Sequence, residues 1–185
     1  NLKKIQNVFL HCFYNTTDTA FSFENLISND KIDFSRYNYF YATFLRNSGK
    51  VLKAKKIVNS SIELYPRNLL LNQYKLDLKN NKYEDNFNCQ NISHVVAEIL
   101  YISANALSSQ NIYASSNFYL NLSKYLNKNF HSFDTLLAEN FYQTKNFDKA
   151  KKIYKEIGKK GKIFLWYAAK QNTKILINEK KNTLF

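Results

Sequence analysis

The stretch LAENFYQTKNFDKAKKIY, residues 137–154, decides the fold of this chain. Two amphipathic segments flank a short polar turn at residues 144–146. Apolar side chains, such as Ala138 before the turn and Ala150 and Tyr154 after it, recur at helical spacing. Neither helix can bury its apolar stripe alone, so the hairpin is expected to pack between neighbouring hairpins.

The composition favours long helices joined by short polar connections. Of 185 residues, 45% are hydrophobic, which is enough to bury a core. The chain has only 3 Gly and 1 Pro, far below ordinary usage, and this scarcity of turn-formers argues against an all-β fold. The chain contains no Met and starts at Asn1, so it is expected to be a fragment or a processed product.

Hydrophobic periodicity predicts helices along most of the remaining chain. Gly49 is expected at a helix end with positive φ, Pro66 is expected to end a helix, and Ser93 is expected to cap one. A polar break is expected at residues 28–33, and residues 79–91 form the longest irregular stretch. The predicted helices span residues 2–14, 19–27, 35–48, 52–64, 68–78, 94–109, 115–126 and 163–178.

A repeated register links the opening stretch to the rest of the chain. Small residues stand 12 positions apart in three places, and the step from Ser116 to Ala150 is 34 residues. Larger apolar residues stand at fixed offsets from these small residues. The small positions are Ala42, Ala54, Ala104, Ser116, Ala138 and Ala150, and the large positions are Leu45, Val58, Leu107, Leu120, Phe141 and Tyr154.

This register resembles the tetratricopeptide repeat, a 34-residue helix-turn-helix unit. The resemblance implies that two helices approach closely at the small positions and that the large residues fill the space to the next hairpin. The chain is also similar to multi-repeat proteins of alphaproteobacteria. The resemblance implies an all-α fold: an α-solenoid of antiparallel hairpins in a right-handed superhelical array. It divides a single domain, 1–185, into repeats at residues 1–34 (degenerate), 35–68, 69–96 (irregular), 97–130, 131–164 and 165–185 (incomplete).

The chain departs from the family pattern in three respects. The Trp of the pattern is replaced by Asn38, Leu100 and Asp134, and the position of Pro66 is taken by Lys128 and Lys162 in later repeats. The step from Ala54 to Ser116 is 62 residues, where two regular repeats would give 68. The middle of the array is therefore expected to be irregular.

The resemblance also implies a function, because such arrays bind polypeptides on a concave face lined by the first helix of each hairpin. The expected function is a non-catalytic protein–protein interaction scaffold. Tyrosine and amide side chains suit a peptide-binding surface, since tyrosine offers contact area and a polar tip. The residues projected onto this groove are Tyr39, Thr43, Arg46, Asn47, Glu98, Tyr101, Asn105, Ser108, Glu139, Tyr142 and Gln143.

The charge supports an alternative function. The net charge is +13, and residues 145–181 contain 12 Lys against 3 acidic residues. Such a segment favours binding to nucleic acid or to an anionic surface. The 26 Asn, the Lys-rich composition and the presence of only three Arg are equally typical of an AT-rich genome.

No catalytic motif or phosphate loop occurs, so neither an enzyme nor a cofactor is predicted. His11, His94 and His131 stand at no metal-ligand spacing and are expected to be half-buried or capping residues. Cys12 and Cys89 are expected to be buried free thiols. No run of 18 apolar residues occurs, so no transmembrane segment is predicted; a bacterial cytoplasmic or periplasmic location is expected.

Overall fold

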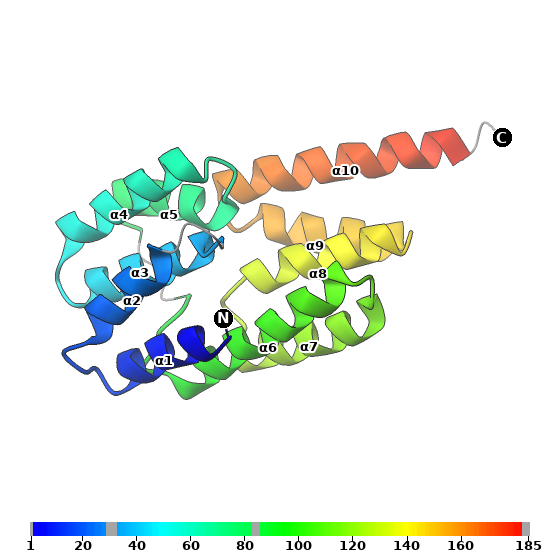
Figure 1. Ribbon diagram of the computed structural model, residues 1–185. Helices are drawn as coiled ribbons and strands as arrows, with labels where there is room; N and C mark the ends of the chain where they lie inside the picture. The colour runs from blue at the N-terminus through cyan, green and yellow to red at the C-terminus, as the bar shows by residue number, and fades with distance from the viewer. Residues whose placement is uncertain (1, 29–32, 83–85, 183–185) are drawn as a thin grey trace. The chain divides into compact units, whose positions relative to one another are not determined.

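The computed structural model describes residues 2–28, 33–82 and 86–182, and over these residues the chain forms ten α-helices and no strand (Figure 1). The all-α prediction is confirmed. The expected break at residues 28–33 and the middle of residues 79–91 lie partly outside the described residues. The helices are α1 (Leu2–Phe13), α2 (Thr19–Ile27), α3 (Ser35–Asn47), α4 (Val51–Leu64), α5 (Leu69–Lys79), α6 (Ile92–Ser109), α7 (Tyr113–Leu126), α8 (Ser132–Gln143), α9 (Phe147–Gly158) and α10 (Lys162–Asn182).

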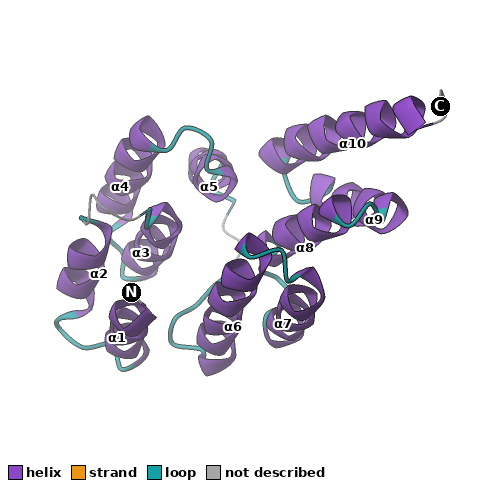
Figure 2. Cartoon of the chain, turned by 45° about the vertical axis from the view of Figure 1, so that its right-hand side comes forward, coloured by secondary structure: helices purple, strands orange, loops and turns teal. Residues whose placement is uncertain are grey.

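The chain divides into two compact units, Asn1–Val96 and Ala97–Phe185. In the first unit each helix from α1 to α4 packs against the next one along the chain, and α3 also packs against α5. In the second unit α8 packs against α7 and α9, and α9 packs against α10 (Figure 2). None of the described helices is both long enough and apolar enough to cross a membrane.

Five turns end the preceding helix in the same way. The second residue after the helix adopts a left-handed conformation, with φ between 49° and 77°. The next backbone N–H then bonds to the carbonyl five residues earlier, as in Asn146 N to Phe141 O at 2.8 Å. This is a Schellman-type C-cap, which satisfies carbonyls that the helix end leaves free. The left-handed residues are Asn15, Gly49, Asn81, Asn111 and Lys145.

Gly49 is the one such position that the sequence predicts, and its φ of +77° confirms it. Three of the other positions are Asn, whose short polar side chain tolerates the left-handed region better than most residues. Lys145 has no such advantage, so its conformation is imposed by the hairpin that joins α8 to α9. The same turn geometry therefore occurs with Asn, Gly or Lys at its left-handed position.

The third turn, at Asn81, is not followed by a return helix in the described residues. Residues 86–91 are non-helical, whereas the other four turns lead directly into a second helix. The sequence predicts its longest irregular stretch at residues 79–91, and the described residues 80–82 and 86–91 are non-helical. α5 thus ends like the first helix of a hairpin, but α6 is the next helix described.

The six small register positions are all fully buried. Ala42, Ala54, Ala104, Ser116, Ala138 and Ala150 each have 0% exposure. At one pair the approach is direct, because the Ser116 hydroxyl donates to the Ala104 carbonyl at 2.8 Å. The burial of all six positions agrees with the register, and the close approach itself is seen at the Ala104–Ser116 pair. Of the large positions, Leu45, Val58, Leu120 and Tyr154 are buried, while Leu107 and Phe141 are half-buried.

Substitution of Ala150 by Leu is expected to lower the free energy of unfolding by roughly 1–3 kcal/mol, because a fully buried site has no room for the added methyl groups. Urea denaturation checks the value. Lys152→Leu is the control, since Lys152 is exposed on the same helix and its replacement is expected to change stability by less than about 0.5 kcal/mol. Equal effects of the two substitutions would contradict the register.

Asparagine side chains cap the N-termini of α5 and α6. Asn68 precedes α5, and its side chain accepts a hydrogen bond from Leu71 N at 3.1 Å. Ser93 is not the N-cap of α6, because the helix begins at Ile92. Asn91 takes that role, and its Oδ1 accepts from Ser93 N at 2.9 Å. Asn and Ser have similar preferences for the N-cap position, so residue type alone does not favour Ser93 over Asn91.

A disulfide joins Cys12 of α1 to Cys89, with the two Cα atoms 5.7 Å apart. The prediction of buried free thiols is therefore wrong in one respect: the cysteines are buried, but they are paired. Phe87 explains the pairing, since it is 2% exposed and its ring lies 5.6 Å from Phe9 and 4.2 Å from Phe40. This aromatic contact brings residues 87–90 against α1 and α3.

Candidate functional site

The groove residues predicted on α3 fall into a buried half and an exposed half. Tyr39 and Thr43 are each 3% exposed, so they do not line an open groove. The Tyr39 ring packs edge-on against Tyr74 of α5 at 5.0 Å, and burial raises its pKa above the usual range. Arg46 is half-buried and donates to Asn47 Oδ1 at 2.7 Å and 3.0 Å.

Beside these residues the chain itself covers part of α3. A cavity of about 380 Å³ lies between α3 and residues 87–90, and its lining includes Thr43 and Asn47. The Phe87 ring beside it is buried against α1 and α3. The first unit therefore presents less of its predicted groove than a regular array would.

The predicted residues on α6 include one that is fully buried and one that supports the core. Glu98 has 0% exposure and offers no surface to a partner. Tyr101 is half-buried, with its ring 5.5 Å from that of Phe133 in α8. Asn105 is exposed, and Ser108, one turn further on, donates to Asn140 Oδ1 at 2.6 Å. Asn105 is thus the predicted α6 residue that is most open to a partner.

On α8 the three predicted residues remain accessible. Glu139 and Gln143 are exposed, and Tyr142 is half-buried. Two residues of α10 meet them: Tyr167 Oη donates to Glu139 Oε1 at 2.6 Å, and Asn178 Nδ2 donates to Tyr142 Oη at 2.7 Å. These bonds hold α8 and α10 in one arrangement.

Burial and the nearby Glu139 carboxylate raise the pKa of Tyr167, so its phenol keeps the proton that it donates. We call the surface formed by Asn105, Glu139, Tyr142, Gln143, Tyr167 and Asn178 the polar face. Tyr167 and Asn178 are not among the residues that the sequence predicts, because the register projects the groove onto complete hairpins only. The long predicted helix at residues 163–178 was the available signal.

A buried polar network links three helices of the second unit. Asn140 is 1% exposed, and its Nδ2 donates to Ser116 Oγ and to Asn117 Oδ1, both at 2.8 Å. Ser108 of α6 donates to Asn140, and Ser116 of α7 donates to the Ala104 carbonyl of α6. The network therefore joins α6, α7 and α8. Its satisfied donors and acceptors fix the positions of the helices that carry Asn105 and Glu139.

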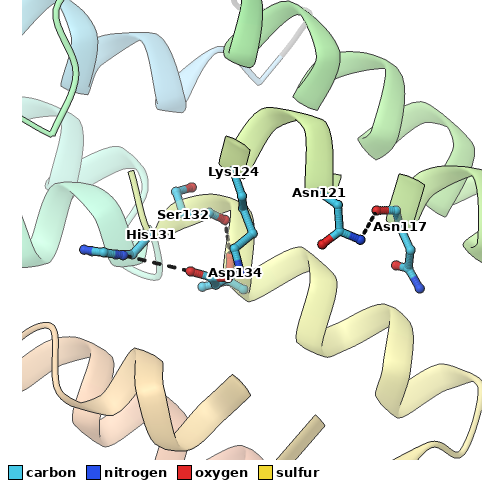
Figure 3. A network of polar contacts seen from close by, with 7 residues as sticks. Asn117, Asn121, Lys124, His131, Ser132 and Asp134 are labelled. Carbon is cyan, nitrogen blue, oxygen red and sulfur yellow. Dashed lines mark hydrogen bonds and ion pairs between the residues drawn. The ribbon is translucent and has the colours of Figure 1, made fainter. Parts of the chain in front are cut away.

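The position where the family pattern has a Trp holds an ion-pair cluster at the start of α8. Asp134 lies in the first turn of α8 and forms ion pairs with Lys124 of α7 and with His131, whose Nδ1 lies 3.9 Å away (Figure 3). Burial raises the pKa of Asp134, but His131 and Lys124 outweigh burial and hold it below its usual value. The helix dipole favours the same charge. The cluster ties α7 to α8.

Substitution of Asp134 by Asn is expected to lower the free energy of unfolding by about 1 kcal/mol at pH 7. The pKa of Asp134 is lower in the folded protein than its unfolded value of about 3.9. The stabilisation that its carboxylate provides is therefore complete above about pH 4. It is lost as pH falls through the folded pKa. The difference between Asp134→Asn and the wild type in urea melts should therefore shrink as pH falls below about 4. A difference that does not shrink as pH falls would contradict the ion-pair assignment.

The basic segment is partly neutralised within the chain. Lys151 pairs with Glu179 at 2.7 Å and with Asp148 at 3.5 Å, and Lys159 pairs with Glu156 at 2.8 Å. The acidic residues of the segment are thus engaged with its own lysines. Lys152 and Lys155 are exposed on α9, and Lys170 and Lys174 are exposed on α10.

The histidines lie in local contacts. His11 Nδ1 is 2.8 Å from Thr16 Oγ1, and His94 Nδ1 accepts from Asn88 N at 3.0 Å. Burial lowers the pKa of His94. Within residues 2–28, 33–82 and 86–182, no three His, Cys, Asp or Glu side chains gather in a way that would hold a metal ion.

Comparison with known proteins adds no relative: no protein-family model matches the chain, and neither the curated proteins nor the solved structures contain a match.

Proposed function

We propose that this chain is a non-catalytic polypeptide-binding module, built as a tetratricopeptide-type array of helical hairpins with an irregular middle. The single observation that carries the proposal is the polar face of the second unit. There Asn105, Glu139 and Gln143 are exposed on helices whose positions are set by hydrogen bonds between helices. A surface that is ordered before binding loses less conformational entropy on association.

The chemistry of the polar face suits an extended peptide. Amide side chains can donate to and accept from a peptide backbone, and the Tyr142 ring offers apolar area beside them. The Glu139 carboxylate favours a segment that carries a basic residue. The fully buried small positions of the same unit support the repeat assignment.

Selection of peptides from a displayed random library against the full chain tests the proposal. Peptides so obtained are expected to bind about tenfold more weakly to the triple variant Asn105→Ala, Glu139→Ala, Gln143→Ala. The matched control replaces three exposed polar residues elsewhere in the second unit: Asn121→Ala, Lys128→Ala and Lys152→Ala. It should leave binding within about twofold. Equal loss in both variants, or no selected peptide, would contradict the proposal.

The exposed lysines of α9 favour a second function, binding of nucleic acid or of an anionic surface. Titration with single-stranded RNA and duplex DNA at two salt concentrations tests it. Micromolar binding with a steep salt dependence, reduced by Lys152→Glu, would support it, and absence of binding at low salt would exclude it.

A further inference from the structure

An apolar groove runs between α9 and α10 in the second unit. Its volume is about 460 Å³, and its wall includes Leu165, Ala168, Asn172 and Leu176 from α10 with Tyr154 and Lys155 from α9. Leu165 and Leu176 are 56% and 54% exposed. Large apolar side chains that are exposed together along a groove mark an interaction surface more often than single ones do.

The register of the chain indicates what kind of element fits this groove. Asn172 stands 34 residues after Ala138 and 68 after Ala104. At Ala104 the return helix α7 lies in direct contact, because Ser116 donates to its carbonyl at 2.8 Å. Ala138 is likewise fully buried, on the helix that packs against α9. The position of Asn172 is therefore one that a helix covers in both earlier hairpins.

The charge around the groove is positive. Lys155 is exposed at its edge, and Lys152 lies one turn earlier on α9. An acidic flank on the bound helix would complement these lysines, since complementary potentials raise association rates and exclude wrong partners. A basic flank would be repelled.

We infer that the α9–α10 groove binds an amphipathic helix of a partner protein, with its apolar stripe against Leu165 and Leu176 and acidic residues toward Lys155. This is the helix-in-groove mode of recognition, in which apolar anchors recur at helical spacing. The groove uses none of the residues of the polar face. Binding in the two places is therefore separable by substitution.

The test uses the full chain and two designed helical peptides that share an apolar stripe at i, i+3, i+4 and i+7. One peptide has Glu on both flanks and the other has Lys. Fluorescence anisotropy is expected to show that the Glu peptide binds at least about tenfold more tightly than the Lys peptide. Equal binding of the two peptides, or no binding of either, would overturn the inference.

Substitutions place the binding in the groove. Leu176→Glu and Lys155→Glu are each expected to weaken the Glu peptide about tenfold. The matched controls are Leu52→Glu, at a leucine 85% exposed on α4, and Lys152→Glu on α9. Leu52→Glu should leave binding unchanged, and Lys152→Glu should weaken it less than Lys155→Glu does. Insensitivity to Leu176→Glu would refute the assignment.

Two further measurements distinguish binding in the groove from binding at the polar face and from self-association. The triple polar-face variant should still bind the Glu peptide; if it does not, the peptide occupies the polar face and the groove assignment fails while the proposed function stands. Sedimentation velocity of the chain alone should show no dimer that Leu176→Glu dissociates. Such a dimer would mean that a second copy, and not an acidic partner helix, covers the groove.

Discussion

Removal of the Cys12–Cys89 disulfide is expected to lower the free energy of unfolding of the first unit by roughly 2–5 kcal/mol. The bond spans 77 residues, so it restricts the unfolded chain strongly. It also attaches residues 87–90 to α1, where Phe87 packs against Phe9 and Phe40. The variant Cys12→Ala, Cys89→Ala removes the bond without adding a buried hydroxyl.

Hydrogen exchange measures this effect unit by unit. Amides of α1 and α3 should exchange faster in the double variant, and amides of α8 and α9 in the second unit should not change. Wild-type protein treated with dithiothreitol is the matched control and should exchange like the variant. Two titratable thiols in unfolded, unreduced protein would show that the disulfide does not form.

Substitution of Asn140 by Leu is expected to lower the free energy of unfolding of the second unit by about 2–4 kcal/mol. The change keeps the approximate size of the side chain but removes three hydrogen bonds, to Ser108, Ser116 and Asn117. Ser108 and Asn117 lose these bonds, and Ser116, which is fully buried, keeps only its bond to the Ala104 carbonyl. The magnitude follows from this loss of bonding, since the volume changes little.

Urea denaturation with two companion variants checks the network. Asn121→Leu replaces an exposed asparagine on α7 and should cost less than about 0.5 kcal/mol. In a double-mutant cycle, Ser116→Ala and Asn140→Leu together should cost less than the sum of the two single changes, by at least about 0.5 kcal/mol. Additive effects would mean that Asn140 and Ser116 are not coupled.

The predicted helices and close-approach positions came from patterns that local physics enforces. A helix exposes a repeating stripe of 3.6 residues, so its apolar periodicity is written in the chain. Ala42, Ala104 and Ala138 stand at the small positions of the register, and all three are fully buried. The observed α2, Thr19–Ile27, has the predicted bounds, and most other helix ends differ by one or two residues.

The candidate site was less predictable, because exposure depends on what covers a helix. Tyr39 was placed in the groove by register, yet α5 packs over it. Glu98 occupies a corresponding surface position on α6 but has no exposure. Asn105, Glu139 and Gln143 are exposed, as a groove residue must be, while binding at these residues stays a prediction. Register assigns a residue to a face of its helix, and only packing decides whether that face is open.

The sequence by itself determined that this chain is all-α, where its helices lie, and which small residues let them meet, because helical periodicity and side-chain volume act over a few residues. Tertiary structure alone decided that Cys12 meets Cys89, that Asn140 joins three helices, and that Lys145 adopts the same turn as Gly49. These outcomes depend on contacts between residues distant in sequence, or on a backbone conformation that the surrounding hairpin imposes. The same holds for residues 137–154: their periodicity predicts a hairpin, but only the packing of α10 against α9 shows the apolar groove beside it.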